Sequence, residues 1–158
     1  MADQENPQAA QLPTPDPALK RLDRFVGTWN AKGRTLDAEE DNVSGRLTFE
    51  WLPGGFFLQQ RVELNFAGYE IHGLELIGYD PESDVFPSTV YSSVVGIPLA
   101  YEYDVQGDDV TIRTEFAGGA TFRGRFGADG DSFSGGWRPD KEVPGNVAYD
   151  ISGTREKS

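Results

Sequence analysis

Between residues 44 and 79, apolar and charged side chains alternate with a period of two, and this pattern restricts the fold more than any other feature. A two-residue turn at Ala67-Gly68 would pair residues 57–66 with residues 69–79 in antiparallel register. A second turn around residues 53–56 would add residues 44–52 to the same sheet. A slip of one residue would exchange the two faces, so the pattern fixes the register.

In this register the two faces of the sheet differ sharply in character. The inner face carries Leu47, Phe49, Trp51, Leu58, Gln60, Val62, Leu64, Phe66, Tyr69, Ile71, Gly73, Glu75 and Ile77. The outer face carries Arg46, Thr48, Glu50, Gln59, Arg61, Glu63, Glu70 and His72. A hairpin at Gly107-Asp108 continues the pattern. It places Val105 opposite Val110, Tyr103 opposite Ile112, Tyr101 opposite Thr114 and Leu99 opposite Phe116, with Glu102 facing Arg113 outside.

Turn-forming residues divide the chain into about ten predicted strands. The strands are 28–35, 44–52, 57–66, 69–79, 85–95, 98–106, 109–117, 120–127, 132–138 and 146–155, with one of the turns at Gly96-Ile97-Pro98. Short links between successive strands predict an antiparallel meander. Because so long a meander must remove its edges, the fold class is all-β, either a sandwich or a closed barrel.

A short helix is predicted just before the first strand, where it would plug one end of the sheet. Asp16 can cap it and Pro17 suits its first position. Its apolar stripe is Leu19, Leu22 and Val26, and Gly27 is predicted to be a left-handed C-cap. Residues 1–15 are predicted to form a disordered acidic tail, which leaves residues 16–158 as one barrel domain.

The composition excludes several classes of function. The chain has no cysteine and one histidine, so thiolate chemistry and multi-histidine metal sites are excluded. A net charge of −12 argues against nucleic-acid partners and anionic membrane surfaces. No apolar run approaches the length of a membrane span, and the N-terminus lacks the features of a signal peptide. We therefore expect a cytoplasmic protein. Dimerisation through an exposed strand is compatible with the pattern, but no sequence feature fixes it.

Three stretches resemble a bacterial lipocalin-like domain family of unknown function within the calycin superfamily, which also contains nitrobindin-like and fatty-acid-binding-protein-like barrels. They are residues 25–29 (FVGTW), 49–58 (FEWLPGGFFL) and 73–81 (GLELIGYDP). The resemblance covers about residues 17–157 and implies a closed lipocalin-like barrel. It also implies that Trp29 closes one end of the barrel and stacks on a cation from the last strand. Arg155 stands on the inner parity of that strand and is placed for this role.

A mostly apolar inner face with a few polar groups predicts a pocket for a small, largely apolar or amphipathic molecule. The candidate ligand-binding residues are Gln60, Val62, Tyr69, Glu75, Tyr79, Tyr101, Tyr103, Thr114 and Tyr149. Inward glycines at 33, 73, 124, 135 and 153 would either leave room inside the barrel or permit its bends. No cofactor or metal is predicted.

Glu75 is the candidate catalytic residue, because burial would raise the pKa of its carboxyl and suit it to general acid or base chemistry. Alternatively, Glu75 lies near a barrel mouth, solvated or paired with an arginine. Three functions stay open: binding of a small molecule, a cofactor-independent isomerase, cyclase or hydrolase, and a packed structural or interaction module. Nitrobindin-like barrels bind haem through a histidine. Here His72 falls on the charged face opposite Glu63, which argues against haem.

Overall fold

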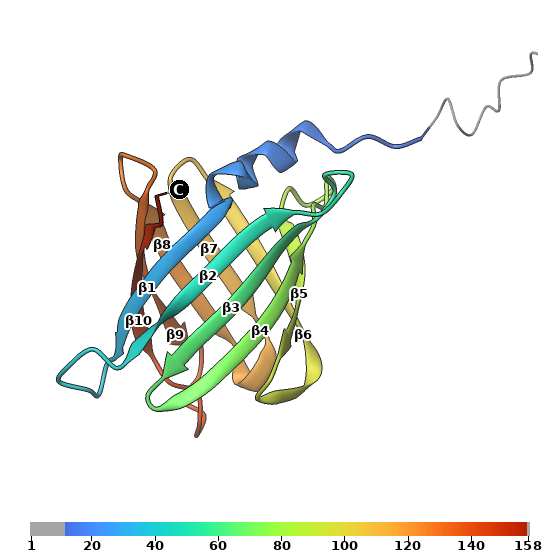
Figure 1. Ribbon diagram of the computed structural model, residues 1–158. Coiled ribbons are helices and arrows are strands. Elements are labelled where there is room, and N and C mark those ends of the chain that lie inside the picture. Colours follow the sequence, from blue (N-terminus) through green and yellow to red (C-terminus); the bar gives the residue numbers. More distant parts are fainter. Residues whose placement is uncertain (1–11, 158) are drawn as a thin grey trace, which may run out of the picture.

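The computed structural model describes residues 12–157 and folds them into a closed, ten-stranded antiparallel barrel (Figure 1). The strands are β1 (Gly27–Thr35), β2 (Val43–Trp51), β3 (Leu58–Phe66), β4 (Tyr69–Ile77), β5 (Phe86–Ser92), β6 (Val95–Gln106), β7 (Asp109–Thr114), β8 (Ala120–Phe126), β9 (Ser132–Pro139) and β10 (Tyr149–Arg155). Each strand pairs with its neighbours in the chain, and β10 returns to β1. The prediction of an all-β closed meander is confirmed. Of the predicted tail, residues 1–15, the first eleven residues lie outside the part of the chain that the structure describes.

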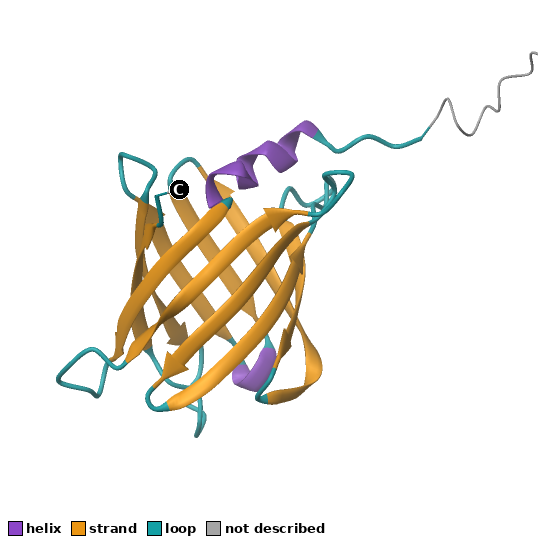
Figure 2. Cartoon of the chain, in the orientation of Figure 1, coloured by secondary structure: helices purple, strands orange, loops and turns teal. Residues whose placement is uncertain are grey.

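The predicted register of the first hairpins is confirmed. Gln60 pairs with Phe49 on β2 and with Glu75 on β4, and Val62 pairs with Leu47 and Gly73. The hairpin at Gly107 also has the predicted pairs as far as Tyr101 and Thr114. The apolar parity therefore points into the barrel and the charged parity points to solvent. Figure 2 shows the strands that carry this alternation as one continuous wall joined by short loops.

Two details of the prediction are wrong. The turn after β5 lies at Ser93-Val94, and Gly96-Ile97-Pro98 belongs to β6 where its register with β5 shifts. An irregular segment there tolerates a proline, which has no N–H to donate. The predicted pair of Leu99 with Phe116 does not form, because β7 ends at Thr114 and Phe116 begins the short 3-10 turn η2 (Phe116–Gly118). Leu99 pairs on its other side with Val90 of β5.

The predicted N-terminal helix is present as a 3-10 helix, η1 (Pro17–Phe25), which lies across one end of the barrel (Figure 1). The Asp16 carboxylate accepts a hydrogen bond from the Ala18 amide at 2.9 Å, as expected of an N-cap. The buried stripe follows the three-residue 3-10 period: Leu19, Leu22 and Phe25. Val26 is half-buried and packs against the core, but it lies beyond the end of the helix, so its predicted place in the helical stripe is taken by Phe25. The helix also ends at Phe25, which makes Gly27 the first residue of β1 and not a C-cap.

Arg155 explains why a glycine stands at position 27. A Cβ built on Gly27 would lie 2.8 Å from the Arg155 Nη1 atom. The guanidinium donates to the carbonyl oxygens of Val26, Arg24 (2.8 Å) and Gly130 (3.1 Å) and pairs with Asp131. Its carbon atom also lies 4.2 Å from the centre of the Trp29 ring, the arrangement that the resemblance implies. Arg155, on β10, thereby joins the end of η1 to the turn between β8 and β9.

The inward glycines of the later strands do not leave open space. A Cβ at Gly124 or Gly135 would overlap the Phe122 ring, and one at Gly153 would overlap the Phe133 ring. At Gly33 the obstacle is the backbone of β10 itself. The rings of Phe122 and Phe133 therefore occupy the space that a Cβ would need at these glycines.

Candidate functional site

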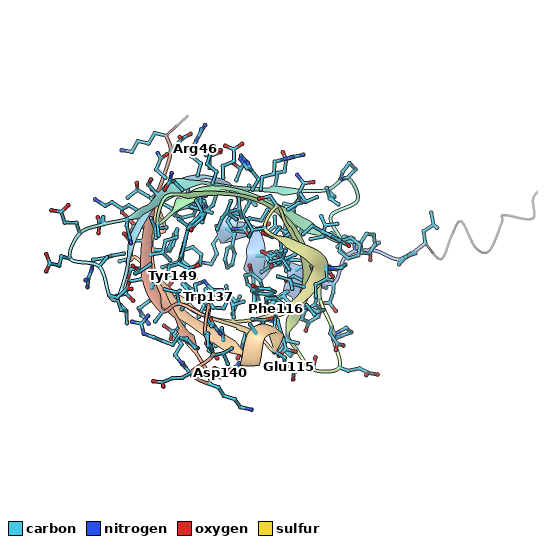
Figure 3. All side chains as sticks on the ribbon, turned by 90° about the horizontal axis from the view of Figure 1, so that it is seen from below. Arg46, Glu115, Phe116, Trp137, Asp140 and Tyr149 are labelled. Carbon is cyan, nitrogen blue, oxygen red and sulfur yellow. The ribbon has the colours of Figure 1, made fainter. Side chains whose placement is uncertain are left out.

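A cavity of about 220 Å³ lies inside the barrel. Its lining is dominated by aromatic rings: Phe25, Trp29, Phe49, Tyr101, Tyr103, Phe122, Phe126, Phe133, Trp137 and Tyr149. Phe25 and Trp29 lie at the end that η1 covers. Figure 3 views the barrel from the opposite end, where Trp137 and Tyr149 project from β9 and β10 towards the interior. The volume exceeds the roughly 150 Å³ of an engineered apolar cavity that binds benzene, so a small ligand can be accommodated.

Glu75 is the carboxyl group of this cavity. It stands in the middle of β4 on the inner parity, between Gly73 and Ile77, and only 4% of its surface is exposed. The Ser88 hydroxyl on β5 donates to its Oε2 atom at 2.6 Å, and the Tyr103 hydroxyl on β6 donates to its Oε1 atom at 2.8 Å. Three adjacent strands therefore hold the carboxyl in one orientation. The alternative of a solvated or arginine-paired Glu75 is wrong, because it is buried and its partners are hydroxyls.

Burial raises the pKa of Glu75 from 4.5 to about 7, because the charged form is desolvated. The hydrogen bonds from Ser88 and then from Tyr103 act in the opposite direction, since they favour the carboxylate. At neutral pH the group is therefore divided between its two protonation states. A carboxyl with this property can accept a proton, donate one, or pair with a cation.

The tyrosines around Glu75 stay protonated. Burial raises the pKa of Tyr103 well above 10, and the charge of Glu75 raises it further. Burial also raises the pKa of Tyr101 and of Tyr149. Their hydroxyls and the Gln60 amide are the neutral polar groups of the lining. Arg125 also lines the cavity, but its guanidinium is exposed and pairs with Asp109 at 2.6 Å. The lumen thus combines one buried, ionisable carboxyl with neutral donors and acceptors.

Six of the nine candidate ligand-binding residues line the cavity: Gln60, Val62, Glu75, Tyr101, Tyr103 and Tyr149. The other three lie elsewhere. Tyr69 begins β4 at the barrel rim, where 73% of it is exposed. Tyr79 follows the end of β4 and donates to Asp84 at 2.8 Å, a bond that raises its pKa. The Thr114 hydroxyl donates to the carbonyl oxygen of Ala100 at 3.0 Å, which ties β7 to β6.

Ser88 is the site residue that sequence reasoning missed. It shares the inner parity of β5 with Phe86 and Val90, and Cα pairing places it opposite Ile77 and Tyr101. The inside–outside alternation of residues 85–95 could have placed Ser88 on the inner face. The segment between β4 and β5, Gly78–Val85, is too long for the sequence to fix which residues of β5 pair with those of β4.

The charged face lies outside the barrel, as predicted. His72 pairs with Glu63 across β3 and β4, and both are exposed. Among residues 12–157, no group of three or more histidine, cysteine, aspartate or glutamate side chains is arranged to hold a metal ion. In the same part of the chain, no helix is long and apolar enough to cross a membrane.

Fold and cavity together define a ten-stranded antiparallel β-barrel whose aromatic lumen contains one buried carboxyl. The chain belongs to the family described as "Protein of unknown function (DUF1579)", whose model matches residues 14–125. A similar fold is found in the crystal structure of Rv2717c from M. tuberculosis, with a TM-score of 0.62 and 14% sequence identity over 90% of this chain and 99% of that chain. At this identity the likeness concerns the fold alone. The search of curated proteins gives no match.

Proposed function

We propose that the barrel binds a small, largely apolar molecule, and that the polar end of this molecule contacts Glu75. The observation that carries the proposal is a cavity of about 220 Å³ with a mostly apolar wall and a few polar groups, among them one buried carboxyl. Small-molecule sites have this composition, since apolar walls supply affinity and a few polar groups supply orientation. The proposal agrees with the calycin-like barrels that the sequence resembles.

The cavity weighs against the alternative of a fully packed module. The large side chains that could have filled the interior, among them Trp29, Phe122 and Phe126, pack against the barrel wall and against one another. They leave a space several times larger than the roughly 30 Å³ that one water molecule occupies in the liquid. A structural role alone gives no reason for such a space beside a buried carboxyl.

A second candidate function is supported by the pKa of Glu75. A carboxyl with a pKa of about 7 can act as general acid or base at neutral pH. Tyr101 and Tyr103 would then serve as hydrogen-bond donors to the substrate. Binding is the first step of such a reaction, so the enzymatic candidate requires the same pocket and adds turnover to it.

Native mass spectrometry of the protein purified from its own host tests the proposal. We expect an adduct of a few hundred daltons that is lost on denaturation and absent from a Val62→Phe variant, whose larger side chain would enter the lumen. Val94→Phe is the matched control, because Val94 lies in the β5–β6 turn and 58% of it is exposed. The proposal would be contradicted if the wild-type protein carried no adduct and if no small apolar molecule displaced an apolar fluorescent probe from it.

A further inference from the structure

Glu75 has no cationic partner within the part of the chain that the structure describes. Seven ion pairs occur between residues 12 and 157, and none of them includes Glu75. Its neighbours across the adjacent strands are Gln60 on β3, Ser88 on β5, and Tyr101 and Tyr103 on β6, all without positive charge. Buried carboxylates are normally paired or hydrogen-bonded to charged groups. This one lacks the positive charge that would balance it.

The hydrogen bonds orient the carboxyl as an acceptor. Ser88 donates to one oxygen and Tyr103 to the other. A carboxylate offers about four lone-pair sites, so two sites remain after these two bonds. Because Glu75 lines the cavity, a ligand in the lumen can reach it. The complementary ligand group is a donor with a positive charge.

The remaining wall of the cavity also suits a cation. Ten of its lining residues are aromatic, and the faces of aromatic rings attract ammonium groups, most strongly where water is excluded. The net charge of −12 surrounds the barrel with a negative potential that raises the local concentration of cations. An anionic ligand would be disfavoured by the Glu75 carboxylate, by the faces of the aromatic rings and by the net negative charge of the protein.

We infer that the lumen binds a protonated primary or secondary amine with a compact apolar body, and that its ammonium group pairs with the Glu75 carboxylate. The inference rests on the proposed function and specifies its ligand class. The competing possibility is a neutral ligand whose carbonyl group accepts a hydrogen bond from protonated Glu75. The two ligand classes require opposite protonation states of Glu75 and are therefore separable by pH.

Matched pairs of neutral and cationic probes test the inference. We would titrate the protein with 2-phenylethylamine, hexylamine and cyclohexylmethylamine, and with the corresponding alcohols, by isothermal calorimetry at pH 7.5. The amines keep their positive charge up to about pH 10. We expect each amine to bind at least 10-fold more tightly than its alcohol, because hydrogen bonds to charged groups are about twice as strong as neutral ones.

The pH dependence of amine affinity gives a readout that needs no variant. With a pKa of about 7, the ionised fraction of Glu75 rises from about 1 in 11 at pH 6 to about 10 in 11 at pH 8, so amine affinity should rise about 10-fold. Arg125 also lines the cavity, but its guanidinium is exposed and pairs with Asp109. The other titratable groups of the lining are Tyr101, Tyr103 and Tyr149. Their pKa values are raised above 10, so they do not titrate in this range. Alcohol affinity should stay flat or fall.

Glu75→Gln removes the charge and keeps the shape of the side chain. We expect amine affinity to fall 10- to 100-fold and alcohol affinity to change less than 3-fold. Glu63→Gln is the matched control, since it removes the same charge from the exposed face of the neighbouring strand. Equal binding of amines and alcohols, or amine affinity that falls as pH rises, would overturn the amine inference and leave the proposed binding function intact. Failure of every probe to bind would overturn both.

Discussion

Replacing Glu75 with glutamine should make the stability of the wild type and the variant diverge as pH changes. Folding raises the pKa of Glu75 from 4.5 to about 7, so the folded protein binds this proton more tightly than the unfolded chain. Below pH 4.5 the group is protonated in both states. Between pH 4.5 and pH 7 the unfolded chain releases its proton first, and stability falls as pH rises. Above pH 7 the loss is complete.

The size of this loss follows from the two pKa values. One pKa unit corresponds to ~1.4 kcal/mol, so ionisation of Glu75 should lower the free energy of unfolding by ~3 kcal/mol once the group is charged in both states. Glutamine has no such penalty. It can keep both hydrogen bonds, because its carbonyl oxygen accepts from one of the two hydroxyls while its amide donates to the other.

Urea unfolding followed by tryptophan fluorescence measures the effect between pH 5 and pH 8. Between pH 5 and pH 8 we expect the free energy of unfolding of Glu75→Gln to rise by ~2–3 kcal/mol relative to that of the wild type. Most of the titration of Glu75 falls within this range. Other groups titrate equally in both proteins and cancel in the difference. Glu63→Gln, on the exposed face, should show no such trend. A constant difference between wild type and Glu75→Gln across the range would refute the reasoning, because it would mean that the carboxyl is not desolvated.

Three further predictions concern closure, packing and the site. Arg155→Leu should lower the free energy of unfolding by ~2–3 kcal/mol, because it leaves three part-buried carbonyl oxygens without their donor. Arg46→Leu, at an exposed pair, should lower it by less than ~1 kcal/mol in the same urea titration. Gly45→Ala should reduce the melting temperature measured by circular dichroism, because its Cβ would overlap the backbone of β3. Tyr103→Phe should raise the pKa of Glu75 in a carboxyl-carbon NMR titration, since it removes a hydrogen bond that lowers this pKa; an unchanged or lower pKa would contradict the assignment.

The parts of the fold that sequence predicts well are those joined by tight turns. Between Val43 and Ile77, an inside–outside alternation runs through three strands linked by short turns, and every pair follows from it. The prediction failed where turn chemistry was ambiguous. Gly96 and Pro98 are typical turn residues, yet they occupy an irregular part of β6, while the turn falls at Ser93-Val94, a pair without strong turn preference.

The site was only partly predictable, for a physical reason. Parity along β4 places Glu75 inside, and that inference requires only a local pattern. Its partners depend on how far β5 and β6 slide along the barrel, and a long link before β5 leaves this offset open. Ser88 was missed for this reason. Thr114 was placed in the pocket because parity cannot distinguish an inward residue at the rim from one at the cavity.

The stability of the protein and its ligand class are linked through one proton. A carboxyl that lowers stability by ~3 kcal/mol when ionised recovers that loss if a cation enters the lumen beside it. Saturation with an amine should therefore reduce the pH dependence of wild-type stability and leave that of Glu75→Gln unchanged. A pH-dependent stability that no amine alters would overturn the amine inference and leave two roles for Glu75, a hydrogen bond to a neutral ligand or proton transfer as a general acid or base. The wild type and Glu75→Gln, measured with and without amine, thus test whether a cation balances the buried carboxylate.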